Sequence, residues 1–225
     1  MVLKIADVRS PDSQASRFRR RRMSLVLDLI GRFPGPVRVL DVGGSPNSWL
    51  PEVGRLPSHC HITFLNLHPV SVSSLPGASS IVGDARNLVG LGNGSFDVCF
   101  SNSVIEHVGT LYDQMAMASE VRRVGRAYFV QTPNLHFPLE PHFLVPAWQY
   151  LPVWLRAAIY RRWNLGWMPR QRDWLLARAE VEQVRLVTRS EMTRLFPDAQ
   201  IVCERIGPLI KGFIAIRTDA PPSPS

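Results

Sequence analysis

The stretch from Val37 to Trp49 constrains the fold of this 225-residue chain more than any other part. It reads Val-Arg-Val-Leu-Asp-Val and continues as Gly-Gly-Ser-Pro-Asn-Ser-Trp. A short apolar run that meets an acid and two glycines is typical of a buried strand that ends in a tight loop before a helix. Gly43 and Gly44 leave room for a ligand beside the backbone, because neither carries a Cβ. In open α/β sheets such loops lie at the carboxyl ends of the strands, where ligands bind.

The rest of the chain alternates strand and helix patterns. Four more short apolar runs predict strands at 61–65, 80–82, 96–100 and 127–130, and a helix is predicted over 105–124. This alternation indicates an α/β fold with a mostly parallel sheet and helices on both faces. Near the end, residues 199–204 and 212–216 predict two strands joined by a short Gly-Pro connection. We expect these two strands to pair antiparallel.

We expect one domain over residues 1–225. A basic helix at 12–33 begins at Asp12-Ser13, and its arginines predict either a solvated face or contact with a ligand. The other predicted parts are a core at 37–131, a partly helical lid at 132–178, a helix with the terminal hairpin at 185–217, and a frayed tail at 219–225.

Composition limits the expected partners and the expected cellular location. The net charge of +8 favours an anionic partner. No secretory signal pattern opens the chain, and no apolar run reaches the ~18 residues of a membrane span. Cys60, Cys99 and Cys203 are widely spaced and match neither a disulfide framework nor a zinc pattern. A reducing cytoplasm is therefore the expected location.

Three motifs in order carry a family resemblance. They are Leu40-Asp41-Val42-Gly43-Gly44, then Gly83-Asp84-Ala85, then Phe96-Asp97-Val98 with Ser103-Val104-Ile105-Glu106-His107-Val108. Together they resemble class I S-adenosylmethionine-dependent methyltransferases of the small-molecule type, over about residues 17–217. The resemblance implies a Rossmann-like seven-stranded sheet with an antiparallel last strand, and S-adenosyl-L-methionine as cofactor.

The resemblance also implies cofactor contacts. The loop with Asp41, Gly43, Gly44 and Ser45 would hold the methionine part, and Asn66 and Leu67 stand at the ribose position. Asp84 and Ala85 resemble the pair that reads adenine, and Ser101 and Asn102 end the strand beside the reactive methyl group.

Two departures from the family pattern stand out. Ser45 and Asn47 replace further glycines, and Asn66 replaces an acid, so it lacks charge-assisted bonds to the ribose and weaker cofactor affinity is expected. A nicotinamide-binding domain would need Gly-x-Gly-x-x-Gly, but Ser45 and Ser48 stand at the later glycine positions.

Two groups of residues could provide a general base for a hydroxyl acceptor. His107 is the leading candidate, because it follows the fourth strand near the expected position of the donor methyl group, and a histidine can titrate near neutral pH. The alternative is that Glu106 and His107 only fix the start of a helix. His136, Glu140 and His142 lie in a proline-rich loop after the fifth strand, and either line the site or sit on its surface.

A metal site is a further interpretation. Ser103-x-x-Glu106-His107 resembles the Glu-x-x-Glu-His run with which some quinone-type O-methyltransferases hold Mg²⁺, with Ser103 in place of the first acid. Because Mg²⁺ demands oxygen ligands, Glu106 and His107 make an incomplete site.

The predicted lid is rich in aromatic and basic side chains. Such side chains suit stacking on sugars or flat rings, contact with a membrane surface, or a packed cap. The residues concerned are Trp148, Tyr150, Trp154, Tyr160, Trp163, Trp167 and Trp174, with Arg156, Arg161, Arg162, Arg170 and Arg172.

The sequence therefore predicts O-methylation of a hydroxyl on a small molecule or saccharide. A nucleic-acid methyltransferase is supported by charge, but the fourth strand ends in Ser-Asn-Ser-Val rather than in the Asn/Asp-Pro-Pro-aromatic run of base amino methylators. A cofactor-binding regulator without catalysis is the third alternative. The oligomeric state cannot be read from the sequence.

Overall fold

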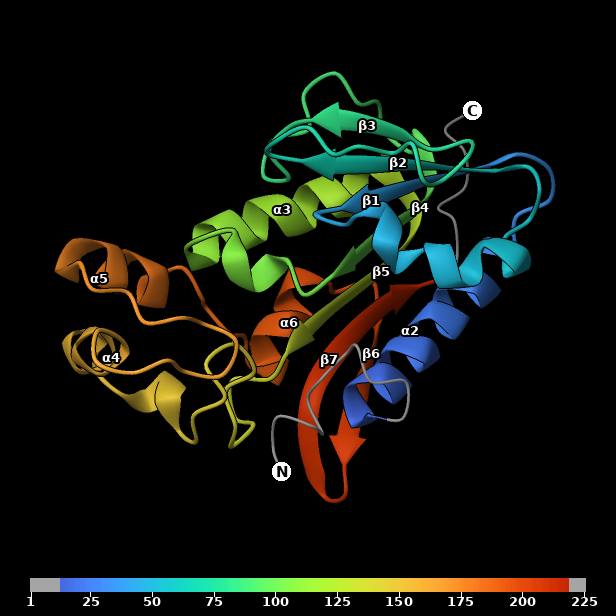
Figure 1. Ribbon diagram of the computed structural model, residues 1–225. Helices are drawn as coiled ribbons and strands as arrows, with labels where there is room; N and C mark the ends of the chain where they lie inside the picture. The colour runs from blue at the N-terminus through green and yellow to red at the C-terminus, as the bar shows by residue number, and fades with distance from the viewer. Residues whose placement is uncertain (1–12, 219–225) are drawn as a thin grey trace.

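A single seven-stranded sheet forms the centre of the computed structural model, which describes residues 13–218 (Figure 1). The strand order is β3-β2-β1-β4-β5-β7-β6. Neighbours from β3 to β5 pair parallel, whereas β7 pairs antiparallel with both β5 and β6, as the sequence predicts. The strands are β1 (Val37–Val42), β2 (Cys60–Asn66), β3 (Ser79–Val82), β4 (Phe96–Asn102), β5 (Gly125–Pro133), β6 (Gln200–Ile206) and β7 (Leu209–Arg217).

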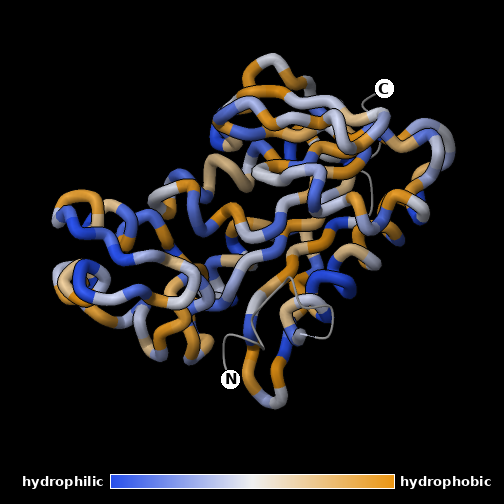
Figure 2. The backbone as a smooth tube through the Cα atoms, viewed as in Figure 1, coloured by the Kyte–Doolittle hydropathy of each residue, from blue (hydrophilic) through white to orange (hydrophobic). Residues whose placement is uncertain are grey.

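Helices cover both faces of the sheet, and side chains alternate between the two apolar layers. In β5, Tyr128 and Val130 join the layer under α3 and α6, while Ala127 and Phe129 join the layer under α2. Figure 2 shows hydrophobic residues interspersed with polar ones along the backbone of the sheet. The helices are α2 (Gln14–Ile30), α3 (Leu111–Val124), α4 (Val153–Tyr160), α5 (Trp174–Glu182) and α6 (Arg189–Leu195), with short 3₁₀ turns at Pro46–Ser48, Leu50–Arg55, Ile105–His107 and Trp148–Tyr150.

The start of α2 confirms the predicted cap. The Ser13 hydroxyl accepts a hydrogen bond from the Ser16 backbone N–H at 3.0 Å, which satisfies one of the free donors of the first turn. Asp12 and the predicted tail at 219–225 lie outside the described residues.

The helix predicted over 105–124 begins later. Ile105–His107 is a 3₁₀ turn, and Gly109 then adopts a φ of +116°, which a continuing helix does not allow. A capping box of Thr110 and Asp113 starts α3 at Leu111. His107 therefore lies in the connection between β4 and α3 and not on a helix.

The segment 132–178, which the sequence analysis predicts as a lid, contains α4 and the start of α5, and an apolar cluster of its own joins these parts. The cluster includes Phe143 and Trp148 from the loop after β5, Tyr160 from α4, and Ala177 and Val181 from α5. In Figure 1, α4 and α5 stand together to one side of the sheet, away from α2. The expectation of a packed cap holds for the fully buried Trp148, whereas four other tryptophans are exposed: Trp154, Trp163, Trp167 and Trp174.

Among residues 13–218, no helix combines the length and the apolar character that crossing a bilayer requires.

Candidate functional site

A cavity of about 120 Å³ opens at the carboxyl ends of β1 and β4. Five of the predicted cofactor residues line it, namely Asp41, Gly43, Gly44, Ser45 and Asn102. The other lining residues come from α2, from β4 and from the turn after β1: Arg19, Arg22, Met23, Ser48 and Phe100.

The two glycines of the loop are required by side chains of the protein itself. Gly43 has a φ of +76°, and a Cβ there would lie 2.6 Å from Cγ2 of Val104. A Cβ on Gly44 would overlap the carboxylate of Asp41. The sequence analysis assigned this room to a ligand, but the space beside both glycines is occupied by Val104 and Asp41.

Asp41 carries a buried carboxyl group in the cavity wall. The indole Nε1 of Trp49 donates a hydrogen bond to Oδ2 of Asp41 at 2.7 Å. Burial raises the pKa of Asp41 to about 7, although the hydrogen bond from Trp49 works in the opposite direction. A cationic group in the cavity would favour the ionised form of this carboxyl.

The remaining predicted cofactor residues lie at the ends of neighbouring strands. The Asn66 amide donates to the carbonyl of Gly44 at 3.0 Å and thereby braces the glycine loop. Ser101 is buried, and its hydroxyl donates to the carbonyl of Val42 at 3.3 Å, inside the sheet. Leu67 is largely exposed at the end of β2.

Asp84 and Ala85 follow β3. Asp84 forms an ion pair with Arg86 at 2.6 Å, and the hydrogen bond from Arg86 lowers the pKa of Asp84. Ala85 packs against the apolar core under α3. Both residues thus keep the strand end in place, and the Asp84 carboxylate already has a cationic neighbour.

Arg22 of the cavity wall belongs to the basic helix, for whose arginines the sequence analysis left open a solvated face or contact with a ligand. It is buried, its Nε donates to Oε1 of Glu204 at 2.7 Å, and its Nη1 donates to Oδ1 of Asn102 at 3.0 Å. Arg22 precedes Val26 by four residues and Leu29 by seven, which is the spacing of the buried face of α2. That spacing was the available signal, but the run of four arginines at 19–22 concealed it.

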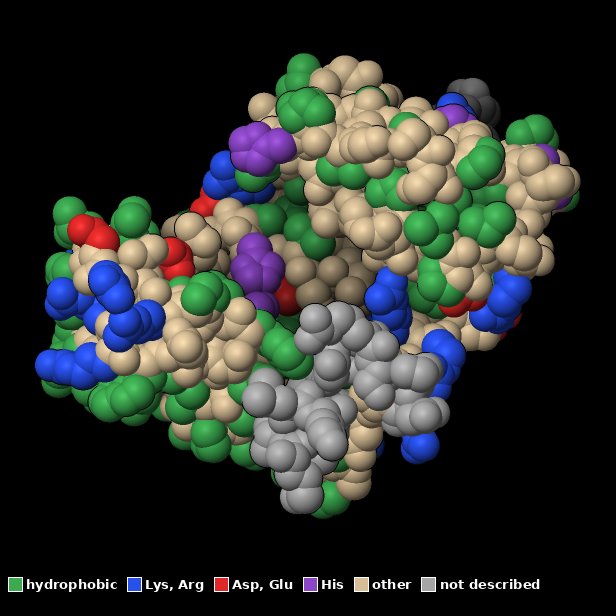
Figure 3. Space-filling model, viewed as in Figure 1, with side chains coloured by type: hydrophobic (Ala, Val, Ile, Leu, Met, Phe, Trp, Pro, Cys, Tyr) green, Lys and Arg blue, Asp and Glu red, His purple; other side chains and the backbone are tan. Residues whose placement is uncertain are grey.

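A second group of residues lies where β4 and β5 end. Glu140 Oε1 is 2.5 Å from Nδ1 of His142, and Nε2 of His142 is 3.1 Å from Nε2 of His107. The other carboxylate oxygen of Glu140 accepts from the backbone N–H groups of His142 and Phe143. Glu140 therefore fixes His142, and His142 contacts His107. Figure 3 shows histidine side chains at the hollow between the lid and the sheet.

The pKa values of the two histidines shift in opposite directions. Burial and the neighbouring His142 lower the pKa of His107 to about 4. Burial also opposes charge on His142, but the hydrogen bond and the charge of Glu140 raise the pKa of His142 above its ordinary value of 6.5. A proton that enters this pair is therefore held on His142.

His136 does not join this group. Its Nδ1 lies 3.0 Å from the hydroxyl of Tyr150, on the lid side of the loop. Of the three residues that the sequence singled out in this loop, the structure brings Glu140 and His142 to His107 and leaves His136 apart.

The predicted Mg²⁺ site does not fit the residues present. One potential ligand atom each from Glu106, His107 and His142 lies within 4.8 Å of the others. Only one of these three is an oxygen, whereas Mg²⁺ takes octahedral oxygen ligands. Glu106 is fully buried, burial raises its pKa, and one of its oxygens accepts from the Thr132 hydroxyl at 2.9 Å. We therefore assign no Mg²⁺ to this group.

Comparisons with known proteins agree with this geometry. Residues 40–127 match the family model described as a methyltransferase domain. An uncharacterized protein of Mycobacterium tuberculosis is 41% identical over 51 residues, which is 23% of this chain and 17% of the relative's length.

Three solved structures share the fold at low identity. A DszA carbon methyltransferase is 13% identical at a TM-score of 0.58, and the match covers 96% of this chain and 57% of that one. An O-methyltransferase family protein from Burkholderia thailandensis is 10% identical at a TM-score of 0.51, and the match covers 96% of this chain and 61% of that one. The N-methyltransferase NodS from Bradyrhizobium japonicum is 13% identical at a TM-score of 0.50, and the match covers 93% of this chain and 99% of that one.

The names of these three proteins specify carbon, oxygen and nitrogen as the atom that receives the methyl group, so they do not indicate which atom this chain would methylate. The sheet order with its antiparallel β7, the glycine loop after β1 and the match over residues 40–127 agree with one another. On these grounds residues 40–127 form a methyltransferase domain, and the sheet has the fold of the solved methyltransferases named above.

Proposed function

We propose that this protein transfers a methyl group from S-adenosyl-L-methionine to a hydroxyl oxygen of a small molecule or saccharide. The observation that carries the proposal is the chain of contacts from Glu140 through His142 to His107 at the ends of β4 and β5. A hydroxyl is a weak nucleophile and gains from a positioned base. A chain of a carboxylate and two imidazoles provides such a base.

The cofactor would lie across the carboxyl ends of β1 to β4. Its methionine part would be held by the glycine loop and Asp41, its ribose by Asn66, and its adenine by Asp84 and Ala85. When bound, S-adenosyl-L-methionine supplies a sulfonium methyl group that an acceptor oxygen attacks in line. Arg22 and Asn102 close the cavity from the side of α2.

In this proposal His107 faces the acceptor, because it is the most exposed of the three residues, while Glu140 is buried. The acceptor hydroxyl gives its proton to the histidine pair, and the proton comes to rest on His142. Glu140 stabilises the resulting imidazolium and fixes the ring through Nδ1. The sequence analysis favoured His107 as the base, whereas the pKa values favour His142 as the final holder of the proton.

The proposed class of acceptor rests on the exposed aromatic side chains of the lid. Exposed tryptophans such as Trp154 and Trp163 offer faces on which a sugar ring can stack. We assign the activity to the cytoplasm, because a reducing compartment maintains the three free cysteines as thiols.

The test is incubation with labelled S-adenosyl-L-methionine and separate fractions of small metabolites, saccharides and RNA. The proposal expects a methyl ether in one of the first two fractions, identified by mass spectrometry and NMR. An N-methyl or C-methyl product would replace the O-methylation assignment, and methylated RNA would replace the acceptor class. Tight cofactor binding without transfer to any fraction would indicate a regulator.

Turnover is expected to rise with pH, with a midpoint above 6.5. Below that midpoint His142 already carries a proton, so the pair cannot accept another from the substrate. The Glu140→Gln variant should shift the midpoint to lower pH, since the amide cannot stabilise the imidazolium by charge. The measurement is kcat against pH for both proteins, and an identical profile for the variant would contradict the role of Glu140.

Gly44→Ala is expected to weaken binding of the demethylated cofactor by roughly 10-fold or more, because the added methyl group overpacks the site. The new Cβ collides with the Asp41 carboxylate. Gly54→Ala is the matched control, since no atom lies within 4 Å of its added Cβ. Calorimetry on both variants checks the prediction, and equal affinities would show that this loop does not hold the cofactor.

A further inference from the structure

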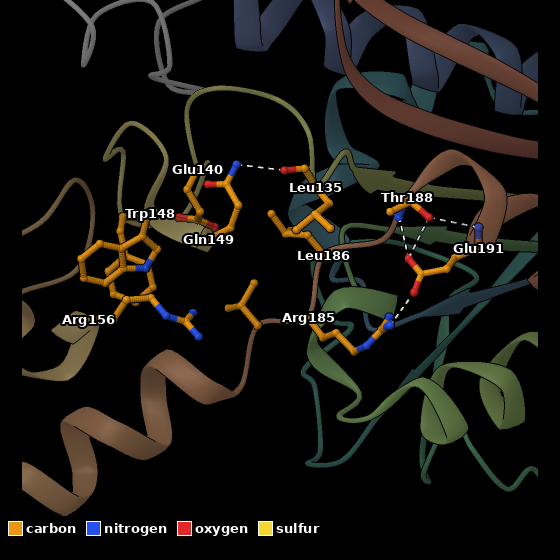
Figure 4. Close-up of a pocket in the computed structure, with 11 residues that line it drawn as sticks. Leu135, Glu140, Trp148, Gln149, Arg156, Arg185, Leu186, Thr188 and Glu191 are labelled. Atoms are coloured by element: carbon orange, nitrogen blue, oxygen red, sulfur yellow. Dashed lines mark hydrogen bonds and ion pairs between the residues drawn. The ribbon is translucent and has the colours of Figure 1, made fainter. Parts of the chain in front are cut away.

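A second cavity, of about 270 Å³, lies at the junction of the lid and the core. One wall is formed by Glu140, Trp148, Gln149 and Arg156, and the facing wall by residues 184–191, as Figure 4 shows. It shares no lining residue with the cavity at β1 and β4. The second cavity is thus separate from the proposed cofactor site.

Three polar atoms of the lid wall are buried and have no hydrogen-bond partner among the described residues. They are the donors Nε1 of Trp148 and Nε of Arg156, and the acceptor Oε1 of Gln149. The Trp148 side chain is 1% exposed, so its N–H has little access to solvent. The Gln149 amide nitrogen already donates to the carbonyls of Leu135 and Phe137, which fixes the position of its free oxygen. Leaving the two donors unpaired is costly, so a ligand that accepts hydrogen bonds from Trp148 and Arg156 would be held strongly.

The charges of the two walls are unequally balanced. Arg185 forms an ion pair with Glu191, which also accepts from Thr188. The Glu140 carboxylate is satisfied by His142 and two backbone N–H groups. Arg156 donates from Nη1 to the Val181 carbonyl at 3.0 Å and makes no ion pair within residues 13–218. The charges of Glu140 and Glu182 act on the Arg156 guanidinium from a distance, and the guanidinium has no direct carboxylate partner among the described residues.

We propose that this cavity binds a small organic carboxylate. The carboxylate accepts hydrogen bonds from Arg156 and from Nε1 of Trp148, and the apolar body of the acid lies against Leu135, Phe143 and Leu186. A single ring or a short branched chain suits the volume. The bound acid joins the lid to the segment that follows it, and this binding does not depend on methyl transfer.

The experiment is calorimetry of the full chain with benzoate at neutral pH, with benzyl alcohol as the uncharged probe of the same shape. We expect benzoate to bind and Arg156→Gln to weaken it by about 10-fold or more, since a charge-assisted bond is lost. Trp148→Phe should weaken binding several-fold. Arg162→Gln, which changes an exposed arginine of the same lid, should leave the affinity unchanged.

Circular dichroism and binding of the demethylated cofactor establish that each variant is folded, and if Arg156→Gln fails to fold, Trp148→Phe decides the matter. Benzoate should also slow amide hydrogen exchange in α4 and α5. The proposal is overturned if benzoate does not bind, if benzyl alcohol binds equally well, or if the Trp148 and Arg156 variants bind benzoate like the parent. Tighter binding of inorganic phosphate than of benzoate would overturn the assignment to a carboxylate and identify a phosphate site.

Discussion

His142→Ala is expected to lower kcat by about 10²–10⁴-fold while the affinity for the cofactor stays unchanged. The variant loses the imidazole that holds the acceptor proton. It also loses the link between His107 and Glu140, because His142 contacts both residues. Single-turnover kinetics with a saturating acceptor measures the chemical step directly. His107→Ala should also cost about 10²-fold or more, because it removes the group that faces the acceptor.

Two further variants make this prediction specific. His142→Gln can still donate to Glu140 but cannot hold a proton, so it should be as slow as His142→Ala. His136→Ala removes a histidine of the same loop whose imidazole contacts the Tyr150 hydroxyl, and this variant should turn over like the parent protein. Normal turnover in His142→Gln would exclude the proposed proton transfer.

Arg22→Ala is expected to lower the free energy of unfolding by about 3–5 kcal/mol, because it leaves Glu204 buried without its cationic partner. Arg22 and Glu204 are both buried, and two hydrogen bonds link them. Urea unfolding followed by circular dichroism measures the loss. Arg21→Ala is the control, since Arg21 is exposed on the same helix and its removal should change stability by less than about 0.5 kcal/mol.

The double variant Arg22→Met with Glu204→Met separates an ion-pair effect from a packing effect. Replacing both charges with apolar side chains of similar length should recover most of the lost stability. If the double variant is as unstable as Arg22→Ala, the buried charge of Glu204 is not the cause. The cofactor cavity should still lose affinity in the double variant, because Asn102 no longer receives the hydrogen bond from Arg22.

The sheet could be predicted from the sequence because its signal is local. Apolar runs of strand length, bounded by Gly, Pro and Ser, gave β1 to β5 and the hairpin of β6 and β7. The glycine loop was equally accessible, since Asp41 near the end of β1 is followed closely by Gly43 and Gly44. The start of α3 was misplaced because the apolar pattern continues through Ile105 and Val108, while Gly109 breaks the backbone.

The second half of the site depends on contacts between distant segments, which a single sequence does not reveal. His107 and His142 are separated by 35 residues, and the fold of the loop after β5 determines that they meet. The ion pair of Arg22 and Glu204 spans 182 residues. The predicted Mg²⁺ rested on a local motif, and the motif could not show that the third group near Glu106 would be an imidazole.

The contact between Arg22 and Glu204 has a consequence for synthesis of the protein. A wall of the cofactor cavity near the start of the chain is held by a side chain in β6, which the ribosome makes 182 positions later. A nascent chain therefore cannot complete this wall of the cavity until β6 has left the ribosome.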